Sequence, residues 1–261
     1  MKVVILAGGF GTRISEESMF KPKPMIDIGG KPILWHIMKY YSKFGFNEFV
    51  ICAGYKQESI KQWFANYFID NSDVTFDFAK KDRVILEYPH CEPWKVTVVD
   101  TGLDTMTGSR IKRVAKYIGD EPFFLTYGDG LSDVDIAAEL EFHRTHGKLA
   151  TMTVVKPQGR FGVLTMEGSN ITEFREKSQK DVGFINGGFL ICEPQVLSYI
   201  PEDDDSIVFE QGPLENLAKD GELMAFRHRG FWQCMDTLRD KTQLEKLLAS
   251  GKAPWVIKKT Q

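Results

Sequence analysis

The chain has 261 residues, of which 43% are hydrophobic and 26% are charged, and its formal net charge is -3 at pH 7. This composition is ordinary for a globular protein, and the length is sufficient for one large α/β domain. Nucleic-acid-binding proteins usually carry a basic surface, which this charge balance does not indicate, so we expect no nucleic-acid partner.

The cysteines and the apolar segments exclude other classes. Cys52, Cys91, Cys192 and Cys234 are far apart and form no CxxC pair, which argues against a disulfide framework or a zinc site and favours reduced thiols. The apolar run at the start is too short for a signal peptide, and no stretch approaches the ~20 apolar residues of a membrane helix. We therefore expect a cytoplasmic protein with no membrane partner.

Apolar runs alternate with helical patterns in the first part of the chain. Residues 2–7 and 49–53 are short apolar runs that end at glycines, which is typical of buried parallel strands. Residues 32–44 and 59–68 have apolar side chains at helical spacing. The order strand, helix, strand, helix predicts βαβ units and a parallel sheet.

The rest of the chain continues this pattern. It predicts strands at residues 123–127, 150–155 and 187–192, helices at 135–146 and 238–250, and a hairpin of edge strands at 162–166 and 171–174. Residues 71–93 are polar and irregular, and we interpret them as a mobile insertion. The expected fold is α/β, with a doubly wound, mostly parallel, Rossmann-like sheet, a small mixed β subregion and one domain over residues 1–261.

A glycine-rich loop directly follows the first predicted strand. It contains Leu6, Ala7, Gly8, Gly9, Phe10, Gly11, Thr12 and Arg13. Glycines let backbone N–H groups approach a phosphate closely, and an arginine adds a planar guanidinium for phosphate oxygens. A dinucleotide fingerprint would need a small residue in place of Ile14, and a Walker loop would need a GK[ST] sequence, which is absent. An ordinary tight turn is the alternative without a ligand.

A stiff lysine segment follows at Lys21-Pro22-Lys23-Pro24. The prolines restrict the backbone to an extended form, so Lys23 is held at a fixed place. Alone, such a segment would be read as a solvated basic loop. Together with the glycine loop upstream, it indicates a triphosphate site.

The GGFGTR segment followed by KPKP resembles the signature of sugar-1-phosphate nucleotidyltransferases, enzymes that make sugar nucleotides. In that family the arginine and the lysine before proline grip the triphosphate, so the resemblance implies catalytic roles for Arg13 and Lys23. Gly54-Tyr55-Lys56 and the layout along the whole chain also fit the family. The resemblance therefore implies a nucleotidyltransferase-type fold and transfer of a nucleotidyl group to a sugar phosphate.

Two aspartates are candidates for binding Mg²⁺, which takes carboxylate and substrate oxygens. Asp129 follows an apolar strand, and ligands of open parallel sheets bind at the carboxyl ends of strands. Asp236 lies in an apolar run, where a carboxylate is costly unless paired or bound to metal. A turn residue and a helix cap, respectively, are the alternatives. The family resemblance also assigns both aspartates to magnesium.

The sugar side rests on two segments that resemble the family. The resemblance implies that Glu176 binds a sugar hydroxyl and Lys177 the sugar's phosphate, and that Asn186 and Gly187 contact the sugar ring. A solvated strand end is the alternative for Lys177. Trp232 either packs on a sugar face or fills the core, and the core is the preferred interpretation.

The loop over residues 101–110 concerns the choice of nucleotide. It resembles the Asp-Thr-Gly…Thr-Gly-x-Arg loop of glucose-1-phosphate cytidylyltransferases. The FWQCMDTLRDK and GKAPW segments resemble other parts of the same enzymes. This resemblance implies CTP and glucose 1-phosphate as substrates and nucleotide contacts by Asp104, Ser109, Arg110 and Gly128. An acceptor such as Asp104 would favour the exocyclic amine of cytosine. A uridylyl- or thymidylyltransferase is the nearest alternative.

Two other functional classes are open. One is a nicotinamide oxidoreductase that uses the glycine loop, and the other is a catalytically silent sensor of sugar nucleotides. Ile14 argues against the first, and the lysines and aspartates argue against the second. The resemblance further implies a homo-oligomer and a product that feeds lipopolysaccharide or O-antigen biosynthesis.

Overall fold

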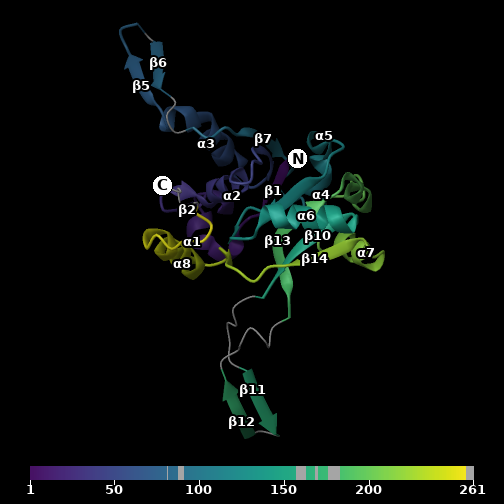
Figure 1. Cartoon of the computed structure of the whole chain (residues 1–261). Coiled ribbons are helices and arrows are strands. Elements are labelled where there is room, and N and C mark those ends of the chain that lie inside the picture. The colour runs from purple at the N-terminus through teal and green to yellow at the C-terminus, as the bar shows by residue number, and fades with distance from the viewer. Residues whose placement is uncertain (81, 88–90, 157–162, 168–169, 176–182, 257–261) are drawn as a thin grey trace.

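A seven-stranded sheet forms the centre of the computed structural model, which describes residues 1–80, 82–87, 91–156, 163–167, 170–175 and 183–256 (Figure 1). The strand order is β14-β10-β13-β8-β1-β4-β7. These strands are β1 (Val3–Ala7), β4 (Glu48–Ala53), β7 (Lys95–Asp100), β8 (Phe123–Tyr127), β10 (Ala150–Val155), β13 (Ile185–Cys192) and β14 (Leu223–Arg227).

The strands of this sheet run mostly in one direction. β1 pairs in parallel with β4 and β8, β4 with β7, and β10 with β14. β13 is antiparallel to both of its neighbours, β8 and β10. The predicted mostly parallel α/β sheet is confirmed, and the carboxyl ends of β1, β4 and β8 meet at one edge.

Helices cover both faces of the sheet because apolar side chains point to both. In β1, Val3 and Ile5 join a core with α2, while Val4 and Leu6 join a second core with α4. Burying one such side chain stabilises the fold by about 1.5–3 kcal/mol. The α-helices are α1 (Ser15–Ser18), α2 (Ile33–Ser42), α3 (Gln57–Asp70), α4 (Thr107–Arg113), α5 (Ala115–Ile118), α6 (Ile136–His146), α7 (Pro213–Lys219) and α8 (Leu238–Ala249). No helix in the described part of the chain is long and apolar enough to cross a membrane.

Four two-stranded sheets complete the described structure. They are β2 (Asp27–Ile28) with β3 (Lys31–Pro32), β5 (Asp73–Asp77) with β6 (Asp82–Glu87), β9 (Gly130–Ser132) with β15 (Trp232–Cys234), and β11 (Val163–Glu167) with β12 (Asn170–Arg175). The β5–β6 and β11–β12 hairpins project from the body of the molecule (Figure 1).

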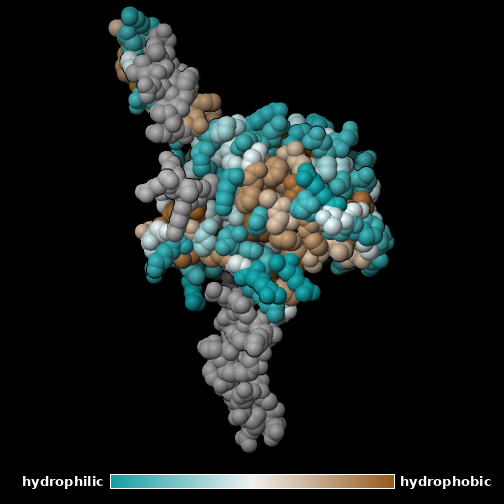
Figure 2. All heavy atoms as spheres, viewed as in Figure 1, coloured by the Kyte–Doolittle hydropathy of each residue, from teal (hydrophilic) through white to brown (hydrophobic). Residues whose placement is uncertain are grey.

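The structure corrects two expectations about these hairpins. β11 and β12 pair as predicted, but with each other in a separate sheet rather than at the edge of the central one. Residues 71–93, read as irregular, contain the β5–β6 hairpin. This hairpin projects from the body (Figure 2), and the side chains of β5 are half-buried or exposed, so no buried face imposes an alternating pattern on that strand. Its strand β5 exposes Phe76, 51% accessible, among polar residues.

Candidate active site

A cavity of about 390 Å³ opens at the carboxyl ends of β1 and β8. The glycine loop after β1, the Lys23 segment, the loop before α4 and the end of β8 form its walls. Its lining residues are Leu6, Ala7, Gly8, Gly9, Phe10, Gly11, Thr12, Lys23, Pro24, Leu103, Asp104, Thr105, Met106, Thr107, Arg110, Tyr127, Gly128, Asp129, Val208 and Asp236. The predicted phosphate-binding loop thus lies beside the predicted metal-binding aspartates.

The ammonium of Lys23 lies between those two aspartates. Its Nζ atom is 2.6 Å from Oδ2 of Asp129 and 2.8 Å from Oδ1 of Asp236. Burial alone would lower the pKa of Lys23, but the charge of Asp129 and the hydrogen bonds to both carboxylates raise it above 10.5. Lys23 therefore stays protonated near neutral pH.

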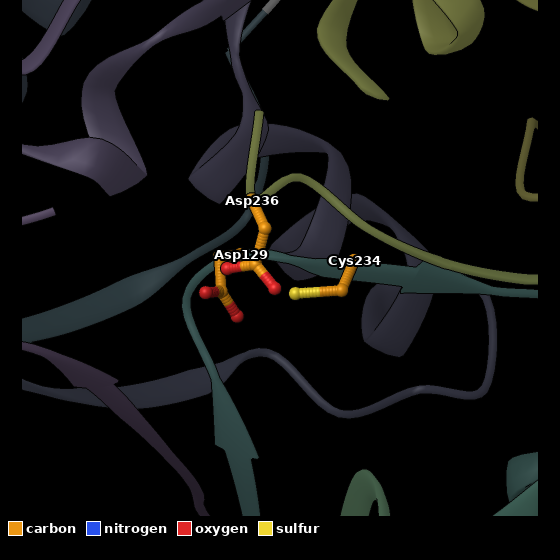
Figure 3. A group of neighbouring side chains, drawn as sticks. All are labelled: Asp129, Cys234 and Asp236. Atoms are coloured by element: carbon orange, nitrogen blue, oxygen red, sulfur yellow. The ribbon is translucent and has the colours of Figure 1, made fainter. Parts of the chain in front are cut away.

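The β9–β15 pair explains how Asp236 reaches Asp129 from the far end of the chain. Cys234 pairs with Gly130, and the backbone N–H of Met235 donates to the carbonyl of Asp129 at 2.8 Å. The side chains of Asp129, Cys234 and Asp236 point toward one another, with ligand atoms within 4.8 Å, so this group could hold a metal ion (Figure 3). Burial raises the pKa of the Cys234 thiol, which therefore stays neutral without a metal.

Thr237, rather than Asp236, is the N-cap of α8. Its hydroxyl accepts a hydrogen bond from the backbone N–H of Asp240, and the Asp240 carboxylate accepts one in return from the N–H of Thr237. This reciprocal pair is a capping box. Asp236 is therefore not the N-cap of α8, and the helix-cap alternative for it was wrong.

A second cavity of about 310 Å³ adjoins the first. The two share Tyr127, Asp129 and Asp236 in their walls. The other lining residues of the second are Gly130, Asn186, Gly187, Gly188, Glu210, Trp232 and Cys234. The predicted sugar-contacting residues Asn186 and Gly187 therefore lie across the aspartates from the glycine loop.

Trp232 supports the wall of the second cavity through its ring N–H. The Nε1 atom of Trp232 donates to the carbonyl of Gly187 at 2.6 Å, and the ring is partly buried against the core. Asn186 in turn accepts from the N–H of Gly188 at 2.8 Å. The preferred interpretation of Trp232 as a core residue is therefore met in part, and packing of the ring on a sugar stays a prediction.

Arg110 anchors the loops that form the first cavity. Its guanidinium is buried, with the residue 4% accessible, and it donates hydrogen bonds to the Thr101 hydroxyl and to the carbonyls of Gly8, Ala53, Gly102 and Leu103. Burial lowers the pKa of the Arg110 guanidinium below its usual value. Arg110 therefore holds together the loops that line this cavity, and its predicted contact with a nucleotide stays a prediction.

The segment before α7, residues 201–212, contacts the loop before α4 and the first turn of α4. The N–H groups of Met106 and Gly108 donate to carbonyls of this segment at 2.8 Å each. The Ser109 hydroxyl donates to the carbonyl of Asp204 and accepts from the N–H of Ile207. Ser109 does not line either cavity described above, because its hydroxyl packs toward this segment rather than toward the glycine loop. Its predicted nucleotide contact therefore has no support in this placement.

The remaining sequence predictions fall on different parts of the structure. Asp104 and Gly128 line the first cavity with the glycine loop. Arg13 lies in the 3-10 helix Thr12–Ile14, but its side chain is outside the described part of the chain. Glu176 and Lys177 also lie outside the described residues.

The sequence analysis missed Tyr127, Glu210 and Cys234 as cavity residues. Tyr127 and Cys234 each lie two positions before a predicted metal ligand. Alternation along an extended chain could have placed them on the same side as Asp129 and Asp236. Glu210 lies in a stretch with no periodic pattern, and no sequence signal marks it.

A model of the nucleotidyl transferase family matches residues 2–237. The chain therefore belongs to the nucleotidyl transferase family. It is 56% identical over 256 residues to a glucose-1-phosphate cytidylyltransferase from Salmonella typhi, with 98% of each chain covered. It is 45% identical over 257 residues to a probable glucose-1-phosphate cytidylyltransferase from Bacillus subtilis, covering 98% of this chain and 100% of that one. These relatives confirm the resemblance found in the sequence.

Solved structures show the same architecture. HddC from Yersinia pseudotuberculosis, complexed with GMP-PN, superposes with a TM-score of 0.67 at 25% identity over 95% of this chain and 99% of that one. A UDP-glucose pyrophosphorylase complexed with UDP-glucose gives a TM-score of 0.68 at 17% identity over 96% and 98% of the chains. The second likeness concerns the fold alone.

Proposed function

We propose that the chain transfers a cytidylyl group from CTP to α-D-glucose 1-phosphate, giving CDP-glucose and pyrophosphate. The observation that carries this proposal is 56% identity, over 98% of both chains, to a protein named for that activity. The arrangement of two adjoining cavities around Asp129 and Asp236 supports it independently.

The two cavities suit the two substrates. The first has the glycine loop and Lys23, which fit a triphosphate, and the second has Asn186 and Gly187, which fit a sugar. Because the cavities meet at the aspartates, substrates in both would bring their phosphates together there. Holding two reactants in such a geometry removes a large part of the entropic barrier to reaction.

The donor set at the junction fits Mg²⁺. Asp129 and Asp236 present the carboxylate oxygens that this hard cation prefers, and the Cys234 thiol is a weaker partner for it. When bound, the metal would neutralise charge on the phosphates. Lys23 adds a fixed positive charge to the same place, and we propose that it and Arg13 bind the triphosphate.

The chemistry is an in-line displacement at the α-phosphorus of CTP. A phosphate oxygen of glucose 1-phosphate forms the new P–O bond. The bond to the bridging oxygen breaks, and its electron pair leaves with pyrophosphate. A sugar phosphate is already ionised near neutral pH, so no general base is required. Positioning and charge stabilisation by the fixed groups of the site then supply the catalysis.

The loop before α4 supports cytosine as the base. Asp104 lines the first cavity with an exposed carboxylate, which accepts but cannot donate a hydrogen bond. Cytosine offers an amine donor where uracil and thymine offer a carbonyl. An acceptor facing that position favours CTP over UTP and dTTP, the substrates of the alternative activity.

Three further proposals follow, of which the sugar contacts and the oligomer rest on resemblance and the compartment on the cysteines and the apolar segments. Glu176 and Lys177 bind the sugar and its phosphate, the protein acts in the cytoplasm, and it assembles as a homo-oligomer. The four cysteines, which form no disulfide, support a reducing compartment.

The exposed rings of Phe76 and Phe78 on the β5–β6 hairpin offer an apolar surface to a second copy. A monomeric mass by light scattering would exclude the oligomer.

The test is pyrophosphate release with glucose 1-phosphate, Mg²⁺ and each of CTP, UTP, dTTP, ATP and GTP. We expect turnover with CTP to exceed that with the other nucleotides by about tenfold or more. Preference for UTP or dTTP would transfer the proposal to the alternative activity. Absence of pyrophosphate release with all five nucleotides would reject either glucose 1-phosphate as the substrate or the enzymatic activity.

A further inference from the structure

Glu210 lines the second cavity and lies on the segment before α7. Its Oε1 atom accepts a hydrogen bond from the Tyr127 hydroxyl, and its Oε2 atom accepts one of 2.7 Å from the Thr107 hydroxyl. Tyr127 lines both cavities, Thr107 lines the first cavity and Glu210 lines the second. One carboxylate therefore links the strand before Asp129 to the nucleotide loop.

The two hydroxyl donors fix the orientation of this carboxylate. Thr107 is itself held, because the backbone N–H of Phe209 donates to its hydroxyl at 2.9 Å. Tyr127 is held as a neutral donor, since burial and the charge of Glu210 raise its pKa. Each oxygen of an ionised carboxylate can accept about two hydrogen bonds, so each keeps room for another donor.

The other polar groups described in the second cavity also have partners within the protein. Asp129 and Asp236 face Lys23, and the Trp232 N–H donates to the Gly187 carbonyl. Asn186 accepts from the N–H of Gly188, and its side chain also hydrogen-bonds Tyr127. Among the described residues that line this cavity, Glu210 is the carboxylate that lies apart from Lys23. A sugar presents hydroxyl donors, and their natural partner is an anionic acceptor held in place.

We propose that Glu210 is a sugar-binding residue that accepts a hydrogen bond from a hydroxyl of the glucosyl group. This inference rests on the proposed function, because it assumes a sugar phosphate in the second cavity. The hydrogen bonds from Tyr127 and Thr107 orient the acceptor. They also connect recognition of the sugar with the loop that receives the nucleotide.

Equilibrium binding separates a sugar contact from a structural role. Glu210→Gln keeps the size of the side chain but replaces one acceptor oxygen with a donor. We expect the Kd of CDP-glucose to rise about tenfold or more, as for loss of a hydrogen bond to a charged group. The Kd of CDP, which lacks the sugar, should stay within about twofold. An equal rise for both ligands, or for neither, would overturn the inference.

Deoxygenated substrates identify the hydroxyl concerned. With the unaltered protein, CTP and the 2-, 3-, 4- and 6-deoxy analogues of glucose 1-phosphate, we expect one analogue to lose about tenfold or more in kcat/KM. Glu210→Gln should treat that analogue and glucose 1-phosphate alike. If the unaltered protein is indifferent to all four deletions, the inference fails, whether or not the variant folds.

Glu202→Gln is the matched control. Glu202 lies in the same segment, is 78% exposed and pairs with Lys112 away from both cavities. The same chemical change there should leave both Kd values unaltered. Absence of CDP-glucose synthesis by the unaltered protein would reject the proposed function, whereas normal synthesis with no effect of Glu210→Gln would reject this inference alone.

Discussion

The ammonium of Lys23 lies 2.8 Å from Oδ1 of Asp236, a residue 213 positions further along the chain. The same ammonium contacts Asp129, so one cation holds two carboxylates that would otherwise repel each other. The position between these carboxylates also suits a divalent metal. Lys23 stabilises the pair of charges that a metal ion bound there would also stabilise.

Replacing Lys23 tests this relationship. In Lys23→Met the two carboxylates lose their ammonium, and we expect the free energy of unfolding without metal to fall by about 1–3 kcal/mol. Added Mg²⁺ should restore more stability in the variant than in the unaltered protein, because it supplies the missing charge. Urea denaturation with and without Mg²⁺ measures this difference.

The same variant tests the triphosphate role. We expect kcat/KM to fall by about a hundredfold or more, as for loss of a fixed charge-stabilising group. Lys21→Met is the control, because the Lys21–Asp27 pair is exposed and contributes little. Near-normal turnover of Lys23→Met would exclude the residue from the site.

Two adjacent substitutions separate metal binding from helix capping. Asp236→Asn should raise the Mg²⁺ concentration for half-maximal activity by about tenfold or more. Thr237→Ala removes the cap of α8 and should cost about 1 kcal/mol of stability with an unchanged metal titration. The prediction fails if the two variants exchange these effects, as judged by Mg²⁺ titration of pyrophosphate release and by urea denaturation.

Gly54 tests the close packing behind the nucleotide loop. A Cβ atom there would lie 2.4 Å from Nη1 of Arg110, 2.6 Å from the Gly102 carbonyl and 2.8 Å from the Gly8 carbonyl. Two of these atoms belong to the backbone, so Gly54→Ala should cost about 1–3 kcal/mol and raise the KM for the nucleotide. A Cβ at Gly9 meets nothing within 4 Å, so Gly9→Ala should change thermal stability little. Equal melting temperatures for the two variants would contradict the prediction.

The sequence predicted the elements and residues that carry a local signal. The buried strands β1 and β8 end before glycines, and the position of Asp129 follows from the end of β8, whereas Lys23 was predicted from the prolines on either side of it. Arg110 shows the limit, because a loop sequence does not reveal that its guanidinium faces inward to backbone carbonyls. Glu210 reaches the site only through the tertiary contacts of an aperiodic segment with α4 and β8.

Glu139 on α6 makes the stability of the protein depend on pH. It is fully buried, its Oε1 atom accepts from the Thr153 hydroxyl at 2.6 Å, and Oε2 has no hydrogen-bond partner among the described residues. Burial raises the pKa of Glu139 from 4.5 to about 7, against the opposing hydrogen bond from Thr153. The nearby Tyr41 and Cys192 stay neutral, because burial also raises their pKa values.

A raised carboxyl pKa means that the folded protein binds this proton more tightly than the unfolded chain does. The contribution of Glu139 to stability is therefore present below about pH 4.5 and is lost as the pH rises to about 7. Glu139→Gln cannot ionise, and its amide leaves one polar group unpartnered just as the protonated acid does. The variant should exceed the stability of the unaltered protein by less than about 1 kcal/mol at pH 5 and by about 3 kcal/mol at pH 8. Glu141→Gln, on the exposed face of the same helix, should show no such divergence. Parallel stability curves for Glu139→Gln and the unaltered protein between pH 5 and 8, measured by urea denaturation, would show that Glu139 does not titrate in this range.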